Sequence, residues 1–238
     1  MSAERRRNPA GSRPGEASPL AVRRPGHALL DSEAPASAAN IPDADAQPAG
    51  RFHTTAMVRN RPRTLVVWRV TATNPLTADR VARLLGGHVH QDPTTGRAEV
   101  LTTAAVVSIL LARPDALDVG WQRSAYRTCD GLAQDDGQPC ACPARLAARR
   151  AAAKRGDGCR PRVEVRFALT DDPAAGVFAF ASEDWSLVEL AGMMRGVLDG
   201  SGVPARARLG LERSLHRLPS GRVLACTRPV IALVARRT

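Results

Sequence analysis

The first 49 residues of this 238-residue chain contain no Phe, Trp, Tyr or Cys. They hold seven prolines and twelve alanines, and their six arginines are balanced by six acidic residues. A segment of this kind cannot bury enough apolar surface to offset the entropy that is lost when it becomes ordered. We therefore expect a disordered arm at residues 1–49 and a single folded domain at residues 50–238.

Because the arm is neutral, the whole net charge of +11 lies in the folded part. Residues 51–69 carry five arginines and no acid, and residues 143–162 carry seven basic residues and one aspartate. Such a surface attracts polyanions or an acidic protein partner. No stretch reaches the roughly 18 apolar residues that span a bilayer, and no apolar segment follows the charged N-terminus. We expect a cytoplasmic monomer that binds no membrane.

Short strands dominate the pattern of the folded part. Residues 64–71 are β-branched and apolar, and the short apolar runs between 98 and 119 are expected to be strands. Residues 163–169 and 177–180 suit a hairpin, and two last strands are expected at 206–216 and 223–234. Helices are expected before Gly86, at 144–155, and from a Ser182 or Asp184 cap to Gly200. The predicted fold class is α+β, with a largely antiparallel sheet, two or three helices and a Cys-rich zinc-binding loop region.

Four cysteines, Cys129, Cys140, Cys142 and Cys159, lie within one segment that is rich in turn-forming residues. Tetrahedral zinc takes four thiolate or imidazole ligands, and loops let the backbone bend around the ion. We therefore predict a Zn²⁺ site in the segment 129–160, with four free thiols as the alternative. Cys226, in an apolar stretch, is expected to be a buried apolar side chain.

Evidence for catalysis is confined to one short run, His88-Val-His90-Gln-Asp92, which echoes the first metal-binding run of metallo-hydrolases. Side chains at this spacing could hold a catalytic metal at the end of a strand. However, Pro93 stands where the second half of that motif would begin. A polar loop after Gly87 is the favoured interpretation, and we predict no catalytic residue.

Several motifs follow one another in an order that resembles a known family. They are Trp68-Arg-Val-Thr71, Cys129-Asp-Gly131, Pro139-Cys-Ala-Cys-Pro143, Phe178-Ala-Phe180 and Trp185-Ser-Leu187. Together they resemble the recombination directionality factors that actinophages pair with large serine integrases, whose relatives are often labelled hydrolase or metal-binding proteins. The resemblance covers residues from about 50 to 234, so the arm before Gly50 is expected to be an addition to the family.

The resemblance implies an accessory protein of phage or prophage origin, without catalysis, that binds a large serine integrase and switches it from integration to excision. DNA within the synaptic complex is a second expected partner. The dense cationic helix supplies the candidate contacts, Arg145, Arg149, Arg150 and Arg155. Two other functions stay open. One is a metal-dependent hydrolase that uses the His88 run, and the other is a zinc-containing DNA-binding protein, which the positive charge and the four cysteines support.

Overall fold

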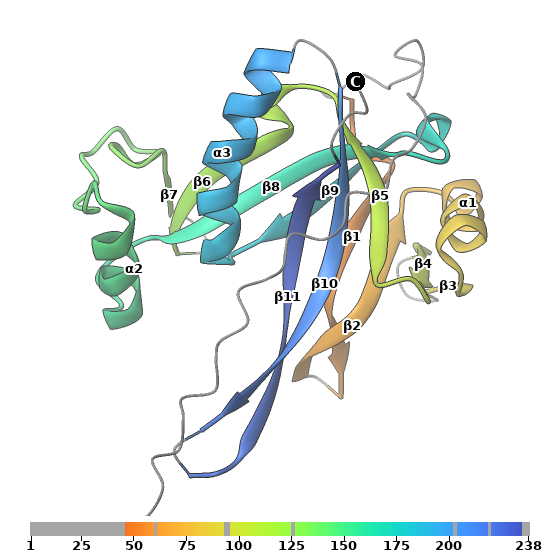
Figure 1. Cartoon of the computed structure of the whole chain (residues 1–238), viewed down its shortest axis with the longest axis horizontal. Helices are drawn as coiled ribbons and strands as arrows, with labels where there is room; N and C mark the ends of the chain where they lie inside the picture. Colours follow the sequence, from red (N-terminus) through yellow and green to blue (C-terminus); the bar gives the residue numbers. More distant parts are fainter. Residues whose placement is uncertain are drawn as a thin grey trace, which may run out of the picture.

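A computed structural model describes residues 46–59, 61–92, 96–124, 127–201, 204–218 and 220–234. These residues form three α-helices: α1 (Pro75–Leu85), α2 (Leu146–Arg155) and α3 (Trp185–Ser201). The strands are β1 (Gly50–Val58), β2 (Arg61–Ala72), β3 (His88–Gln91), β4 (Ala98–Leu101), β5 (Val106–Leu111), β6 (Leu117–Ser124), β7 (Arg127–Cys129), β8 (Arg160–Leu169), β9 (Val177–Ser182), β10 (Ala205–Arg217) and β11 (Val223–Leu233). Figure 1 shows their arrangement.

All the strands belong to one sheet with the order β11-β10-β5-β8-β9-β1-β2-β4-β3, while β6 pairs with β7 and with β8. Every pairing in the described part of the chain is antiparallel except that of β1 with β9, where Gly50 lies opposite Phe178. The predicted fold class, α+β with a largely antiparallel sheet and a Cys-rich region, is confirmed.

A short link forces this sheet to curl. Residues 102–105 join β4 to β5, although four strands separate the two in the sheet. In a flat sheet these strands would lie about 24 Å apart, whereas a link of this length reaches about 18 Å. The curl is tied at Trp68, whose backbone N–H and indole Nε1 donate to Thr102 Oγ1 and to the Ala105 carbonyl, both at 3.1 Å.

The core inside the curl is built around Trp68, which is fully buried. Phe52 and Phe180 meet its ring edge-on, at centroid distances of 5.6 and 5.3 Å. Phe167 and Phe178 extend the cluster from β8 and β9. Helix α3 adds four buried side chains to the same core, namely Leu187, Ala191, Met194 and Leu198.

Local signals in the sequence explain most helix ends. The Asn74 side chain caps α1 by accepting from the Thr77 N–H at 2.8 Å, and Gly86 ends the helix at φ 71°. Asp184, one of the two expected caps, precedes α3, and its side chain accepts from the Ser186 N–H in the first turn at 2.8 Å. Helix α2 begins at Leu146 rather than at 144, because Pro143 stays in the preceding loop.

Three strands, β1, β3 and β7, were not anticipated. The segment 50–58, which has little regular alternation, becomes β1 by pairing with both β2 and β9. The run from His88, interpreted as a polar loop, begins with the edge strand β3. The arm predicted at 1–49 lies outside the described residues up to position 45, while Ala49 hydrogen bonds to Val177 and Thr73 and so belongs to the folded part. No helix among the described residues is long and apolar enough to cross a membrane.

A half-buried histidine makes stability depend on pH. His53 lies opposite Arg69 and two residues after Arg51, and its Nε2 is 3.0 Å from Thr71 Oγ1. Burial, with the charges of Arg69 and Arg51, lowers the pKa of His53 from 6.5 to about 4. The unfolded chain therefore binds this proton more readily, and stability is lost as pH falls from about 6.5 towards 4.

We expect the melting temperature to fall over this range of pH, and His53→Gln to make the fall smaller by a few degrees, because glutamine does not titrate. Calorimetry between pH 7 and 4 measures the difference. His88→Gln, on the exposed edge strand, is the matched control. An identical pH dependence of wild type and His53→Gln would contradict the assignment.

Candidate metal centre

Three neighbouring strands bring the four cysteines together. Cys129 ends β7 and Cys159 stands just before β8, while β6 pairs with both of these strands. Trp121 on β6 lies opposite Cys129 on one side and opposite Pro161 on the other. The register thus places Cys129 opposite Trp121 and Cys159 two residues before the other position opposite this tryptophan.

The loop between the first and second cysteines is a compact reversal. The Asp130 carboxylate accepts from the backbone N–H groups of Leu132 and Ala133, both at 2.8 Å. These bonds hold the pKa of Asp130 below its usual value. Ala133 then bridges to Pro139, and the Cys140 N–H donates to the Leu132 carbonyl at 2.7 Å. The turn residues return Cys140 to the neighbourhood of Cys129.

The four sulfur atoms form a tight group. They all lie within 4.8 Å of one another, with Sγ–Sγ distances of 3.6 Å for Cys129–Cys159, 3.2 Å for Cys140–Cys142 and 3.7 Å for Cys140–Cys159. Sulfurs at about 2.3 Å from a tetrahedral zinc lie roughly 3.8 Å apart, whereas a disulfide requires about 2.05 Å. The cysteines are free thiols in a geometry that could hold a metal ion.

Burial disfavours the thiolate form of these cysteines unless a cation is bound among them. Cys129 and Cys159 are 5% and 0% exposed, and burial is the main cause that raises the pKa of both thiols. Burial acts to raise the pKa of Cys140 as well, but hydrogen bonds with Cys142, Cys129 and Cys159 together outweigh it and lower that pKa. Four thiolates at this spacing repel one another, so a bound cation is what would stabilise them.

A second aromatic cluster covers the cysteines. Trp121 packs on Trp185 at a centroid distance of 5.6 Å, and both contact the buried cysteine group. The Arg149 guanidinium lies 4.1 Å from the centroid of the Trp121 ring, in a cation–π contact. We call the region 129–159, with Trp121 behind it, the cysteine lobe.

Arg149, which was predicted as part of the partner-binding set, is almost fully buried and forms its hydrogen bonds within the lobe. Its side chain is 6% exposed, and it donates to the carbonyls of Pro143 and Gly131 at 3.0 and 3.1 Å. Gly131 has φ 108°, and a Cβ there would lie 3.2 Å from the Arg149 guanidinium. Neither Trp121 nor Gly131 was singled out from the sequence, although the Cys-Asp-Gly motif contains the glycine.

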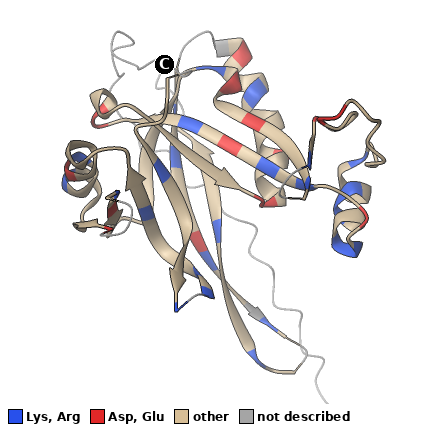
Figure 2. Cartoon of the chain, turned by 180° about the vertical axis from the view of Figure 1, so that it is seen from behind, with Lys and Arg blue, Asp and Glu red and all other residues tan. Residues whose placement is uncertain are grey.

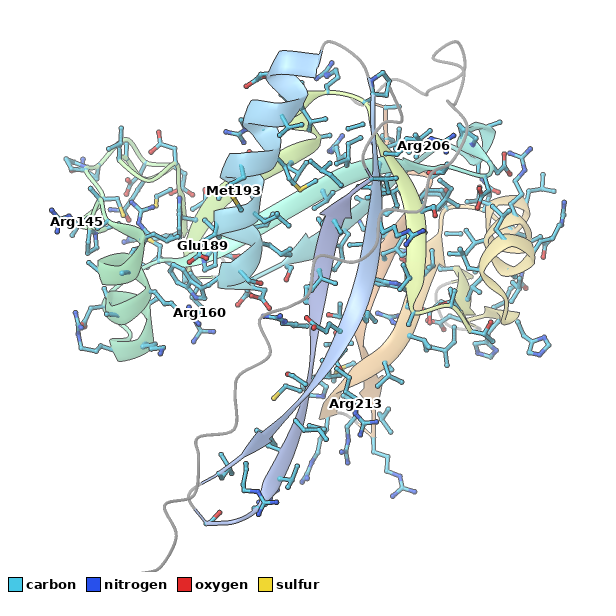
Figure 3. All side chains as sticks on the ribbon, in the orientation of Figure 1. Arg145, Arg160, Glu189, Met193, Arg206 and Arg213 are labelled. Carbon is cyan, nitrogen blue, oxygen red and sulfur yellow. The ribbon has the colours of Figure 1, made fainter. Side chains whose placement is uncertain are left out.

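The other predicted contacts lie on the outer face of the lobe. Arg145, Arg150 and Arg155 are exposed, and so is Lys154. Arg155 forms an exposed ion pair with Asp157 at 3.3 Å. Figure 2 shows Lys and Arg residues on α2, and Figure 3 shows Arg145 at the outer side of the lobe. The structure thus leaves a basic helix face free of the core.

The other candidate metal run does not converge. His88 and His90 project from the same side of the edge strand β3 and are exposed, opposite Leu101 and Glu99 on β4. Among the described residues, the four cysteines are the group whose ligand atoms come close enough to share an ion. Cys226, expected to be buried, lies half-buried on β11, away from that group.

Replacing Arg149 with alanine should destabilise the cysteine lobe by about 2–4 kcal/mol, because two carbonyls lose their donor and Trp121 loses its cation. Arg150→Ala, one residue along and exposed, should change stability by about 0.5 kcal/mol or less. Thermal unfolding and amide exchange over residues 129–159 distinguish the two variants. Equal effects would mean that Arg149 does not hold the lobe.

Comparison with known proteins places the chain in a family. No solved structure matches it. A family model matches residues 24–217, from the arm to the end of β10. Because the match starts at residue 24, it corrects the expectation that everything before Gly50 is an addition. The chain therefore belongs to the Gp3-like family, which is described as recombination directionality factor-like.

Proposed function

We propose that the protein binds a large serine integrase and switches it from integration to excision, with no turnover of its own. The family match over residues 24–217 carries this proposal. Membership implies an interaction with a recombinase or with DNA in general. We further propose a large serine integrase as the partner, excision as the promoted reaction, and a phage or prophage as the origin.

The proposed mechanism is a bias between two assemblies. The integrase can pair attP with attB or attL with attR, and a factor that binds one synaptic arrangement more tightly shifts the balance towards it. A difference of about 5.5 kcal/mol in binding moves a two-state population from 1:99 to 99:1. An accessory protein can therefore reverse direction by differential affinity alone.

The cysteine lobe fits this role as a rigid platform. Closed sites with four cysteine ligands are typically structural, whereas catalytic zinc sites keep an open position for water or substrate. We propose zinc as the ion, held by Cys129, Cys140, Cys142 and Cys159. The exposed cations Arg145, Arg150 and Arg155 are the proposed contacts on that platform, facing an acidic side of the integrase or DNA in the synaptic complex.

Purified protein should contain about one equivalent of zinc, because the four sulfurs match the ligand number and spacing of that ion. Elemental analysis measures the content. Removing the metal should loosen residues 129–159 in amide exchange while the Trp68 core stays protected. Cys159→Ser, which removes one ligand, should loosen the same residues, and Cys226→Ser, outside the group, is its control. A metal-free protein with an equally protected lobe would contradict the site.

In reactions with purified integrase, the protein should inhibit recombination of attP with attB and activate that of attL with attR. Reversing Arg145 and Arg150 to glutamate should raise the concentration needed for both effects by roughly ten-fold, because charge at a contact changes sign. Arg83→Glu on α1 is the control. If the integrase keeps the same preference for attachment sites when the wild-type protein is added, the proposed function is refuted. If the double variant acts at the same concentration as wild type, only the proposed contact at α2 is removed.

A further inference from the structure

The ends of two hairpins extend beyond the core. The β1–β2 hairpin turns at Arg59, and β10 pairs with β5 only between Ala205 and Gly210. Beyond Gly210, β10 pairs only with β11, so the rest of this hairpin is a two-stranded ribbon. We call the described residues of the two ends, 57–59, 61–66, 213–218 and 220–225, the fork. Figure 1 shows both ends pointing to the same end of the molecule, and both β10 and β11 contact β2.

The core-facing side of the sheet continues along the fork, where no described element covers it. Side chains two residues apart on a strand share a face. Trp68 is fully buried, whereas Val66, next on the same face, is 54% exposed. On β10, Leu209 is fully buried and Leu215, on the same face, is 67% exposed, with Ala225 opposite it. The apolar face therefore runs past the point where the described residues bury it.

Half of the exposed large hydrophobic side chains in the described part of the chain lie on the fork: Met57, Val58, Val66, Leu215, Leu218, Val223 and Leu224. Aliphatic side chains gain nothing from a phosphate backbone, whereas they form the centre of protein interfaces. This composition favours a protein over a nucleic acid as the occupant.

The charge of the fork selects the partner further. Its cations are Arg59, Arg61, Arg63, Arg213, Arg217 and Arg222, and its sequence contains no acidic residue. The nearest carboxylate on the ribbon, Glu212, is already paired with Arg228 at 2.7 Å. Arg59 stands at φ 49°, a conformation that favours glycine or asparagine. Figure 2 shows the cations at both hairpin ends.

We propose that the fork docks an acidic protein surface that carries apolar side chains among its carboxylates. This inference rests on the proposed function, in which the integrase supplies that surface. The fork is a second contact, separate from α2: Figure 1 places the cysteine lobe at one side of the molecule and the fork at its lower end. The apolar side chains provide the affinity, and the arginines that lie among them provide the electrostatic steering.

The test measures binding of the full chain to immobilised cognate integrase by interferometry at 0.1 and 0.5 M NaCl. Two fork variants, Arg213→Glu with Leu215→Ser and Arg61→Glu with Met57→Ser, should each bind at least about ten-fold more weakly. Leu76→Ser with Arg83→Glu, an exposed pair of the same kind on α1, should bind within about two-fold of wild type. Wild-type affinity should fall at the higher salt concentration. Melting temperatures of all variants show that each is folded.

Each other outcome decides between the two proposals. Fork variants that bind like wild type would overturn the docking surface and leave the proposed function intact. A wild-type protein that does not bind the integrase would refute the proposed function, and the fork's partner with it. Fork variants that bind the integrase normally but lose self-association in sedimentation, or lose binding to a 30-base-pair duplex, would assign the fork to a second copy or to DNA.

Discussion

The edge-to-face packing of Trp68 against Phe52 and Phe180 is the interaction on which the rest of the fold depends. The chain has four phenylalanines, and all of them join Trp68 in this one cluster. Because their strands are β1, β2, β8 and β9, the cluster holds the single parallel pair in the described sheet within an antiparallel surround. With so few aromatic side chains, the core can be large in only one place.

The remaining two tryptophans explain how the cysteine lobe attaches. Trp121 and Trp185 form a separate cluster, and Arg149 of α2 packs its guanidinium over the Trp121 ring. Helix α2 has little large apolar surface of its own, so this arginine replaces the missing hydrophobic contact with hydrogen bonds and a cation–π contact. The lobe is thus held by the cysteine group and by one arginine.

Local patterns predicted what local chemistry determines. Alternation identified the β8–β9 hairpin, Gly86 and Gly156 marked the ends of α1 and α2, and turn residues between cysteines indicated their convergence. Long-range pairing could not be predicted in this way. The segment of β1 forms a strand because it pairs with β2 and β9, and the segment of β3 forms one because it pairs with β4. Arg149 shows the same limit at the site, since its charge suggested the surface, whereas its neighbours Trp121 and Gly131, distant in sequence, bury it.

The distribution of charge follows from the same scarcity of large apolar residues. Arginines that flank the Trp68 core pair with acids, as Arg69 does with Glu99 at 2.7 Å. The fork and the outer face of α2, by contrast, combine cations with few carboxylates and lie outside the aromatic clusters. Elements that contribute little to the core are free to carry unbalanced charge, because repulsion among exposed arginines is screened by water. A basic protein of this composition can therefore place its binding surfaces on the elements whose sequence is least constrained by folding.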